Sequence, residues 1–203
     1  MTGREPESEK RILTIGHSNH PIDHFLELLK QCLVEVVVDT RSHPVSKFAP
    51  HFDSENLKKA LTERGLHYLY MGRELGGRPK GDQFYDQDGH VLYDKVAQSP
   101  AFLQGVSRLE QEIRDYRVAL LCSEENPAAC HRRLLVSRVL EQRGVTVVHI
   151  RGDGRVQSEA EVAVECGSDD ANQLALFEQV EAPQWKSIPS VSQRKRQSSS
   201  SVF

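Results

Sequence analysis

The stretch from Val118 to Leu140, VALLCSEENPAACHRRLLVSRVL, decides the fold class of this chain. Its first residues, Val118–Leu121, form an apolar run that is typical of a buried strand. Pro127 then interrupts regular secondary structure, and a helical pattern follows from about Cys130 to Arg143. Reactive side chains therefore occupy the carboxyl end of a strand and the start of the next helix, which is where ligands bind in open α/β sheets.

Short apolar runs and helical patterns alternate on both sides of this stretch. Further strands are expected at Arg11–Gly16, Glu35–Asp39, His67–Tyr70 and Val145–Ile150, with helices near 21–32, 54–64 and 99–113. Such alternation favours parallel βαβ units. We therefore expect an α/β domain over residues 11–150, a Rossmann-like three-layer sandwich whose mostly parallel sheet has about five strands.

The composition limits the class of protein. The 203 residues suit one domain and a tail, and the net charge of -3 gives no overall attraction to nucleic acid or to an anionic membrane. Four scattered cysteines argue against a disulfide scaffold, so the thiols are expected to be free or metal-bound. The polar amino terminus shows no signal peptide, and no apolar run approaches the roughly 20 residues that span a bilayer. We expect a soluble cytoplasmic protein with no membrane partner.

Polar side chains follow four of the predicted strands at the point where each strand ends. They are His17 and Ser18, Asp39 and Arg41, Tyr70 and Arg73, and Cys122 and Glu124, and the helix start after the fourth strand adds Cys130, His131 and Arg132. Because the carboxyl ends of parallel strands meet at one edge of a sheet, we expect these side chains to share one cleft.

Four segments of the chain resemble the family known as domain of unknown function 488. They are TIGHS (Thr14–Ser18), VDTRSHPVSK (Val38–Lys47), YLYMGRELGGRP (Tyr68–Pro79) and LLCSEENPAACHRRLL (Leu120–Leu135). The resemblance covers about residues 11–150 in order. It implies an α/β domain and does not indicate a reaction, so the chemistry has to be argued from the residues.

Arginines near the strand ends predict a pocket for an anion, because the planar guanidinium pairs well with phosphate. The expected anion-binding residues are Arg41, Arg73, Arg78, Arg132 and Ser18. The glycines of the YLYMGRELGGRP segment would allow backbone N–H groups to approach such a ligand. The alternative is that some of these arginines form surface ion pairs with Glu74, Asp82 or Glu124.

Three chemistries fit the expected cleft, and we rank them in the following order. Glu124 is a nucleophile or general base, with His17 or His131 as acid and base. Cys130 is a nucleophile activated by the helix start and by His131. Cys122, Cys130 and His131 bind zinc together with His17 or Asp39. The lack of a CxxC pair weakens the third option, and no cofactor is predicted.

The segment QLALF at residues 173–177 lies in a region, 151–203, whose composition predicts a flexible tail. It resembles the peptide by which bacterial proteins bind the DNA sliding clamp. In that comparison Gln173 provides a polar contact, and Leu174, Leu176 and Phe177 provide apolar ones. The alternative is an amphipathic turn packed on the domain.

Together these features favour an enzyme that processes a nucleotide or nucleic acid, in DNA repair or base processing, tethered to the clamp by its tail. The alternative is a non-catalytic adaptor that binds an anionic ligand or nucleic acid at the same pocket. Carboxylates or thiols with perturbed pKa values would favour the enzyme. A pocket with only arginines and backbone donors would favour the adaptor.

Overall fold

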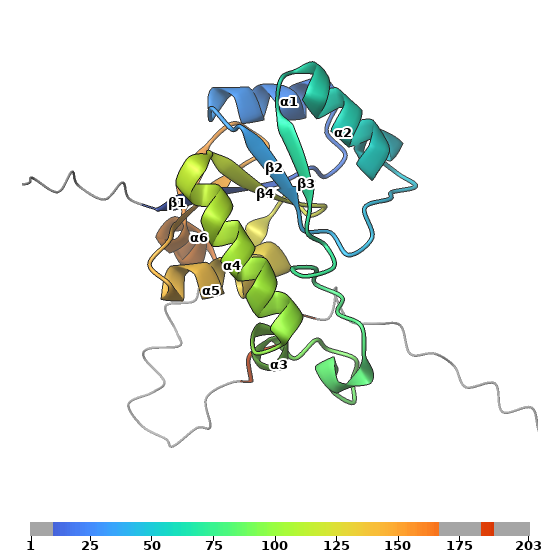
Figure 1. The fold of residues 1–203 in the computed structure, drawn as a ribbon, viewed down its shortest axis with the longest axis vertical. Helices are drawn as coiled ribbons and strands as arrows, with labels where there is room; N and C mark the ends of the chain where they lie inside the picture. The colour runs from blue at the N-terminus through green and yellow to red at the C-terminus, as the bar shows by residue number, and fades with distance from the viewer. Residues whose placement is uncertain (1–9, 167–183, 189–203) are drawn as a thin grey trace, which may run out of the picture.

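Six strands form one sheet in the computed structural model, which describes residues 10–166 and 184–188 (Figure 1). The strands are β1 (Arg11–Gly16), β2 (Val36–Asp39), β3 (His67–Tyr70), β4 (Val118–Cys122), β5 (Thr146–Ile150) and β6 (Val156–Ser158). Their order is β3-β2-β4-β1-β5-β6; β1 to β5 pair in parallel, and β6 runs antiparallel to β5. The predicted α/β architecture with a mostly parallel sheet is confirmed, and the sheet has one strand more than expected.

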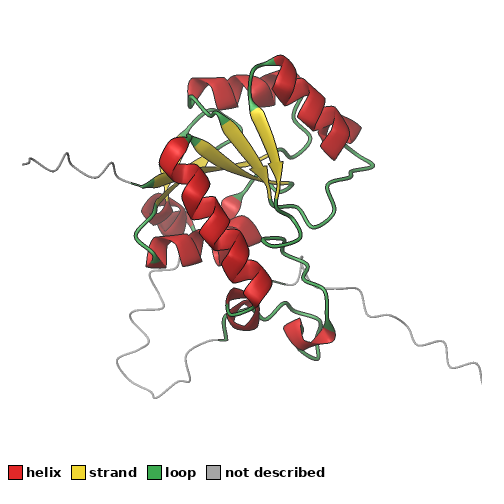
Figure 2. Ribbon diagram, viewed as in Figure 1, coloured by secondary structure: helices red, strands yellow, loops and turns green. Residues whose placement is uncertain are grey.

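Helices cover both faces of this sheet, as the ribbon in Figure 2 shows. The α-helices are α1 (Ile22–Gln31), α2 (Ser54–Glu63), α3 (Tyr93–Ala97), α4 (Pro100–Asp115), α5 (Arg138–Gln142) and α6 (Glu159–Glu165), and a π-helix (Arg132–Ser137) precedes α5. Among the described helices, none is long and apolar enough to cross a membrane.

The core has two parts, one on each face of the sheet. On one face α1 and α2 pack Phe25, Leu29 and Leu57 against β-strand residues such as Val37. On the other face, α4, the π-helix and α5 pack side chains that include Phe102. Because helices cover both faces, β2 and β4 are buried along their whole length, which is typical of parallel strands.

The ordered domain continues past Ile150, where the sequence placed the start of a flexible tail. β6 pairs with β5, and α6 begins with a capping box in which Ser158 and Glu161 satisfy each other's backbone groups. Glu159 binds His149 and Arg133, which holds α6 on the domain. A three-residue strand and a short acidic helix give too little apolar periodicity to be recognised from sequence.

Residues 184–188 also belong to the domain. The indole N–H of Trp185 donates to the carbonyl of Leu134 at 2.7 Å, and the guanidinium of Arg138 lies 4.5 Å from the centre of the Trp185 ring. The backbone of Ser187 pairs with that of Val91. The predicted clamp peptide, residues 173–177, lies outside the described residues.

Candidate functional site

The topological switch point of the sheet lies between the carboxyl ends of β1 and β4. These strands are neighbours, yet α1 follows β1 on one face while the π-helix follows β4 on the other. Beyond the strand ends the pairing continues, since the N–H of His17 donates to the carbonyl of Cys122 and that of Ser18 to Ser123, at 3.0 and 2.8 Å. Ligands of open α/β sheets bind at such points.

Two cysteines and a histidine lie at this switch point, and we call them the Cys2His cluster (Cys122, Cys130 and His131). The Nδ1 atom of His131 lies 3.6 Å from the sulfur of Cys122 and 3.9 Å from that of Cys130. On the opposite side of the ring, Nε2 donates to the carbonyl of Thr40 at 3.1 Å, which fixes the ring orientation. All three cluster residues are buried.

The pKa values of this cluster depart from their ordinary range. A hydrogen bond from the Cys130 thiol, with the charge of His131, holds the pKa of Cys122 well below its usual value despite burial. Burial raises the pKa of Cys130, so this thiol keeps its proton. Burial opposes protonation of His131, but the Cys122 thiolate outweighs it and raises the pKa of His131. The Cys122 thiol is therefore more acidic than an ordinary cysteine, and the Cys130 thiol and the His131 ring lie beside it.

Glu124 extends the cluster towards solvent. The residue is exposed, and partial burial of its carboxyl group together with the charge of Cys122 raises its pKa, while a hydrogen bond with the Cys130 thiol opposes the shift. A carboxyl group with a raised pKa is suited to proton transfer near neutral pH. Of the residues that the sequence proposed as catalytic, Glu124 is exposed to solvent and the other four are buried.

Tyr93, at the start of α3, lies near enough to Cys130, Glu124 and Cys122 to interact with them electrostatically. Its side chain is fully buried, its hydroxyl has no hydrogen-bond partner among the described residues, and burial with the nearby Cys130 raises its pKa. Sequence reasoning missed Tyr93 because nothing in LYDKV marks a functional position. It also missed Thr40, whose role is played by a backbone carbonyl.

Asp39, Arg41 and His17 form a network that is satisfied within the protein. Arg41 donates to both carboxylate oxygens of Asp39, at 2.9 and 2.6 Å, and the Tyr68 hydroxyl donates to the same carboxylate at 2.7 Å. The remaining guanidinium nitrogen donates to Nε2 of His17 at 3.1 Å. Burial and Arg41 lower the pKa of His17 to about 4. His17 is thus neutral at pH 7, and Arg41 has few donors left for a ligand.

Arg132 is likewise occupied. It is completely buried, and it donates to the carbonyls of Glu124 and Glu125 and, at 3.3 Å, to the hydroxyl of Thr14. The sequence placed Arg132 among the anion-binding residues. The structure shows instead that its guanidinium connects the loop after β4 to β1 through hydrogen bonds, so Arg132 fixes the backbone at Glu124.

Two other predicted anion-binding residues project from the glycine-rich loop after β3. Gly77 lies so close to His131 that a Cβ atom there would be 2.6 Å from the ring carbon Cγ. This contact places the loop over the Cys2His cluster. Arg73 and Arg78 are both exposed, and within the described part of the chain neither has a carboxylate in ion-pair distance. They remain available to an anion.

Ser18, the fifth predicted anion-binding residue, lies at the turn that follows β1. It is half-buried with a φ of 45°, and its hydroxyl donates to the side chain of Asn19 at 3.3 Å. A non-glycine residue in this conformation is uncommon and costs strain. Ser18 therefore lies at the carboxyl edge of the sheet, where its backbone N–H donates to the carbonyl of Ser123.

A separate surface groove lies at the amino ends of β2, β3 and β4. It measures about 820 Å³ and includes Lys30, Arg64 and Arg117 in its lining. None of the perturbed thiol, imidazole or carboxyl groups described above lines this groove, so we do not place the candidate site there.

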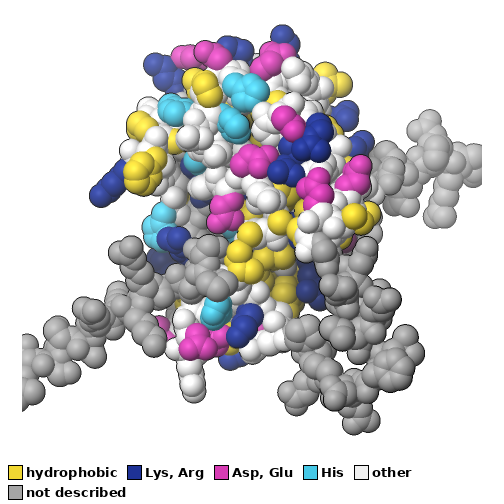
Figure 3. Space-filling view, turned by 180° about the vertical axis from the view of Figure 1, so that it is seen from behind, with side chains coloured by type: hydrophobic (Ala, Val, Ile, Leu, Met, Phe, Trp, Pro, Cys, Tyr) yellow, Lys and Arg dark blue, Asp and Glu magenta, His cyan; other side chains and the backbone are white. Residues whose placement is uncertain are grey.

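On the face shown in Figure 3, positive and negative side chains are interspersed, which agrees with the small net charge.

Comparison with known proteins gave one result. The family described as "Domain of unknown function DUF488" matches residues 21–139, which is more than half of the chain. No curated protein and no solved structure matched. The matched range contains β2, β3, β4 and the whole Cys2His cluster, and the family resemblance inferred from the sequence is confirmed. The chain therefore belongs to this family, the domain of unknown function 488.

Proposed function

We propose that the chain is an enzyme that processes a nucleotide or nucleic acid at the carboxyl edge of a Rossmann-like sheet. One observation supports this most strongly, the contact of Gly77 with His131. It joins a loop that carries two exposed arginines, neither of which has an ion pair among the described residues, to a buried cluster of thiol and imidazole groups. Arg78 follows Gly77 directly in this loop, so an anion bound there would lie near the cluster.

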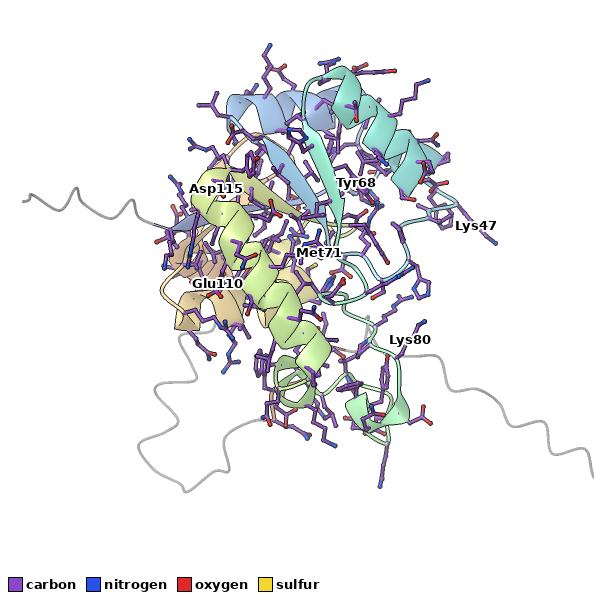
Figure 4. The ribbon with its side chains drawn as sticks, viewed as in Figure 1. Lys47, Tyr68, Met71, Lys80, Glu110 and Asp115 are labelled. Carbon is purple, nitrogen blue, oxygen red and sulfur yellow. The ribbon has the colours of Figure 1, made fainter. Side chains whose placement is uncertain are left out.

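Further cations and an aromatic ring extend the ligand site outward. Lys47 and Lys80 are exposed and have no ion-pair partner among the described residues, and Figure 4 shows them on the loops beyond the ends of β2 and β3. The amide of Arg78 donates to Ser42, which links the two loops. Next to Lys47, Phe48 is 95 % exposed. Exposed aromatic rings among cations are typical of sites where nucleobases stack.

In this proposal Glu124 acts as the general acid and base. Its carboxyl group is exposed, has a raised pKa and lies beside the Cys2His cluster. The perturbed groups favour the enzyme over the adaptor, because a site that only binds an anion needs arginines and backbone donors but no thiolate.

Binding and turnover of nucleotides test this proposal. The full chain should bind nucleoside phosphates and short single-stranded DNA, measured by calorimetry. The double variant Arg73→Ala, Arg78→Ala should lose at least tenfold in affinity, whereas Arg108→Ala, which removes an exposed arginine of α4, should keep it. Glu124→Gln should bind as the natural chain does but convert no ligand. Equal affinity in the double variant and the Arg108→Ala control would contradict the proposal.

The tail would bring this activity to DNA. We propose that QLALF binds a sliding clamp, so that tethering raises the local concentration of a chain whose net charge is negative. This rests on the sequence pattern alone. Replacing both Leu176 and Phe177 with Ala should abolish binding to a purified bacterial clamp and leave the melting temperature unchanged. A fall in melting temperature would indicate that these side chains pack on the domain.

A further inference from the structure

The geometry of the Cys2His cluster matches that of a metal site. A tetrahedral zinc with bonds of about 2.3 Å to sulfur and about 2.0–2.1 Å to nitrogen separates its sulfur and nitrogen ligands by about 3.6 Å. The two sulfur-to-nitrogen distances are 3.6 Å for Cys122 and 3.9 Å for Cys130. All three ligand atoms lie within 4.8 Å of one another. A single ion could therefore contact all three with little movement.

The orientation of His131 is that of a metal ligand. Its Nε2 atom faces the carbonyl of Thr40 at 3.1 Å, and a carbonyl only accepts, so Nε2 carries the proton. When Nδ1 carries no proton, its lone pair is directed at the two sulfur atoms. Metal-bound histidines are commonly oriented in this way, by a hydrogen bond from the nitrogen that does not bind the metal.

The residues around the cluster suit a fourth, open position. Tyr93 has a buried hydroxyl without a partner, and water bound to a metal would provide one. Glu124 reaches solvent beside Cys130. Two thiolates balance the charge of a divalent ion, so the site is neutral when filled. Three protein ligands with one open position are characteristic of catalytic zinc sites.

We propose that Cys122, Cys130 and His131 bind one zinc ion, with the fourth position open to water next to Glu124. Binding forms two zinc–sulfur bonds and one zinc–nitrogen bond, and each thiol that still carries its proton releases it to solvent. The ion would lower the pKa of its bound water and so provide a nucleophile at the carboxyl edge of the sheet. Only this catalytic role rests on the function proposed above; the metal site itself does not.

Elemental analysis and cobalt substitution test the site. The reduced full chain, free of any histidine tag, should contain about one zinc per chain, as expected for a single set of three protein ligands. Replacing zinc with Co²⁺ should give the intense near-ultraviolet absorption of cobalt bound to thiolate. Cys122→Ser and Cys130→Ser should each lose most of the metal. Cys32→Ser and Cys166→Ser are the matched controls, since both of these cysteines lie outside the cluster, and they should keep it.

Several results would overturn the proposal. A folded, reduced chain that takes up neither zinc nor cobalt would do so, as would cobalt binding without the thiolate absorption. Either result can be read on the natural chain, so it holds even if the buried Cys130 variant does not fold. Glu124→Gln should keep its zinc, and loss of zinc in it would mean that Glu124 fills the fourth position and that the site is closed.

These outcomes are separate from those of the nucleotide experiment. A chain that holds zinc but binds no nucleotide would retain the metal site and lose the proposed function. A chain that binds nucleotide through Arg73 and Arg78 but holds no metal would retain the proposed function and lose the metal site.

Discussion

Arg132→Ala should destabilise the protein strongly, although arginine at this position looks like a ligand-binding residue in the sequence. The buried guanidinium donates to two backbone carbonyls, of Glu124 and Glu125, in addition to the Thr14 hydroxyl. Hydrogen bonds that involve a charged group contribute about 1.5–3 kcal/mol each, so losing the two carbonyl contacts should cost about 3 kcal/mol or more. For a chain of this size that corresponds to a melting temperature lower by about 6–12 °C.

Differential scanning calorimetry of Arg132→Ala and Arg73→Ala side by side measures this difference. Arg73 is exposed and has no ion pair within the described residues, so its removal should change the free energy of unfolding by less than about 0.5 kcal/mol. Arg73→Ala should instead weaken nucleotide binding. If Arg132→Ala melts like the natural chain but loses affinity for nucleotide, the role of Arg132 as a support for the Glu124 loop is refuted.

Three further predictions concern packing and pH. Gly77→Ala should lower the free energy of unfolding in denaturant by about 1–3 kcal/mol, because the new Cβ would overlap the His131 ring; an unchanged value would contradict the packing of the loop. By NMR, His17 should stay neutral until the pH falls to about 4, since burial and Arg41 oppose its protonation; a titration near pH 6.5 would contradict this. Because the unfolded chain takes up this proton near pH 6.5, the neutral His17 stabilises the fold above pH 6.5, and this contribution is lost as the pH falls from 6.5 towards 4. Hydrogen bonds from His149 and Arg133 outweigh burial and hold the pKa of Glu159 below 4.5, so Glu159→Gln should be less stable than the natural chain at pH 7 and approach it as the pH falls below 4.5; a difference that does not vary with pH would refute the ion pair.

The strands could be predicted because their signal is local. β1 and β3 begin and end where the sequence placed them, and β2, β4 and β5 are shifted by at most one residue at either end. Apolar runs between polar ends suffice for this. β6 and α6 could not be predicted, because a short strand and a helix with one buried apolar side chain depend on contacts with β5 and with His149.

The position of the candidate site could also be predicted, but the state of its residues could not. Parallel strands bring His17, Asp39 and Cys122 to one edge whatever their partners are. Whether a guanidinium is available depends on tertiary contacts. Arg41 and Arg132 bind partners within the protein, whereas Arg73 and Arg78 have no ion pair in the part of the chain that the structure describes. The sequence shows no difference between these two pairs of arginines.

An NMR titration with a nucleoside diphosphate tests the central claim most directly, because it locates the ligand on the chain without assuming a reaction. We predict that the largest amide shifts occur from Gly72 to Arg78 and around Glu124, at the carboxyl edge of the sheet. The large groove at the opposite edge, near Lys30, Arg64 and Arg117, should not respond. Shifts confined to that groove, with none at Arg73, Arg78 or Glu124, would contradict the account.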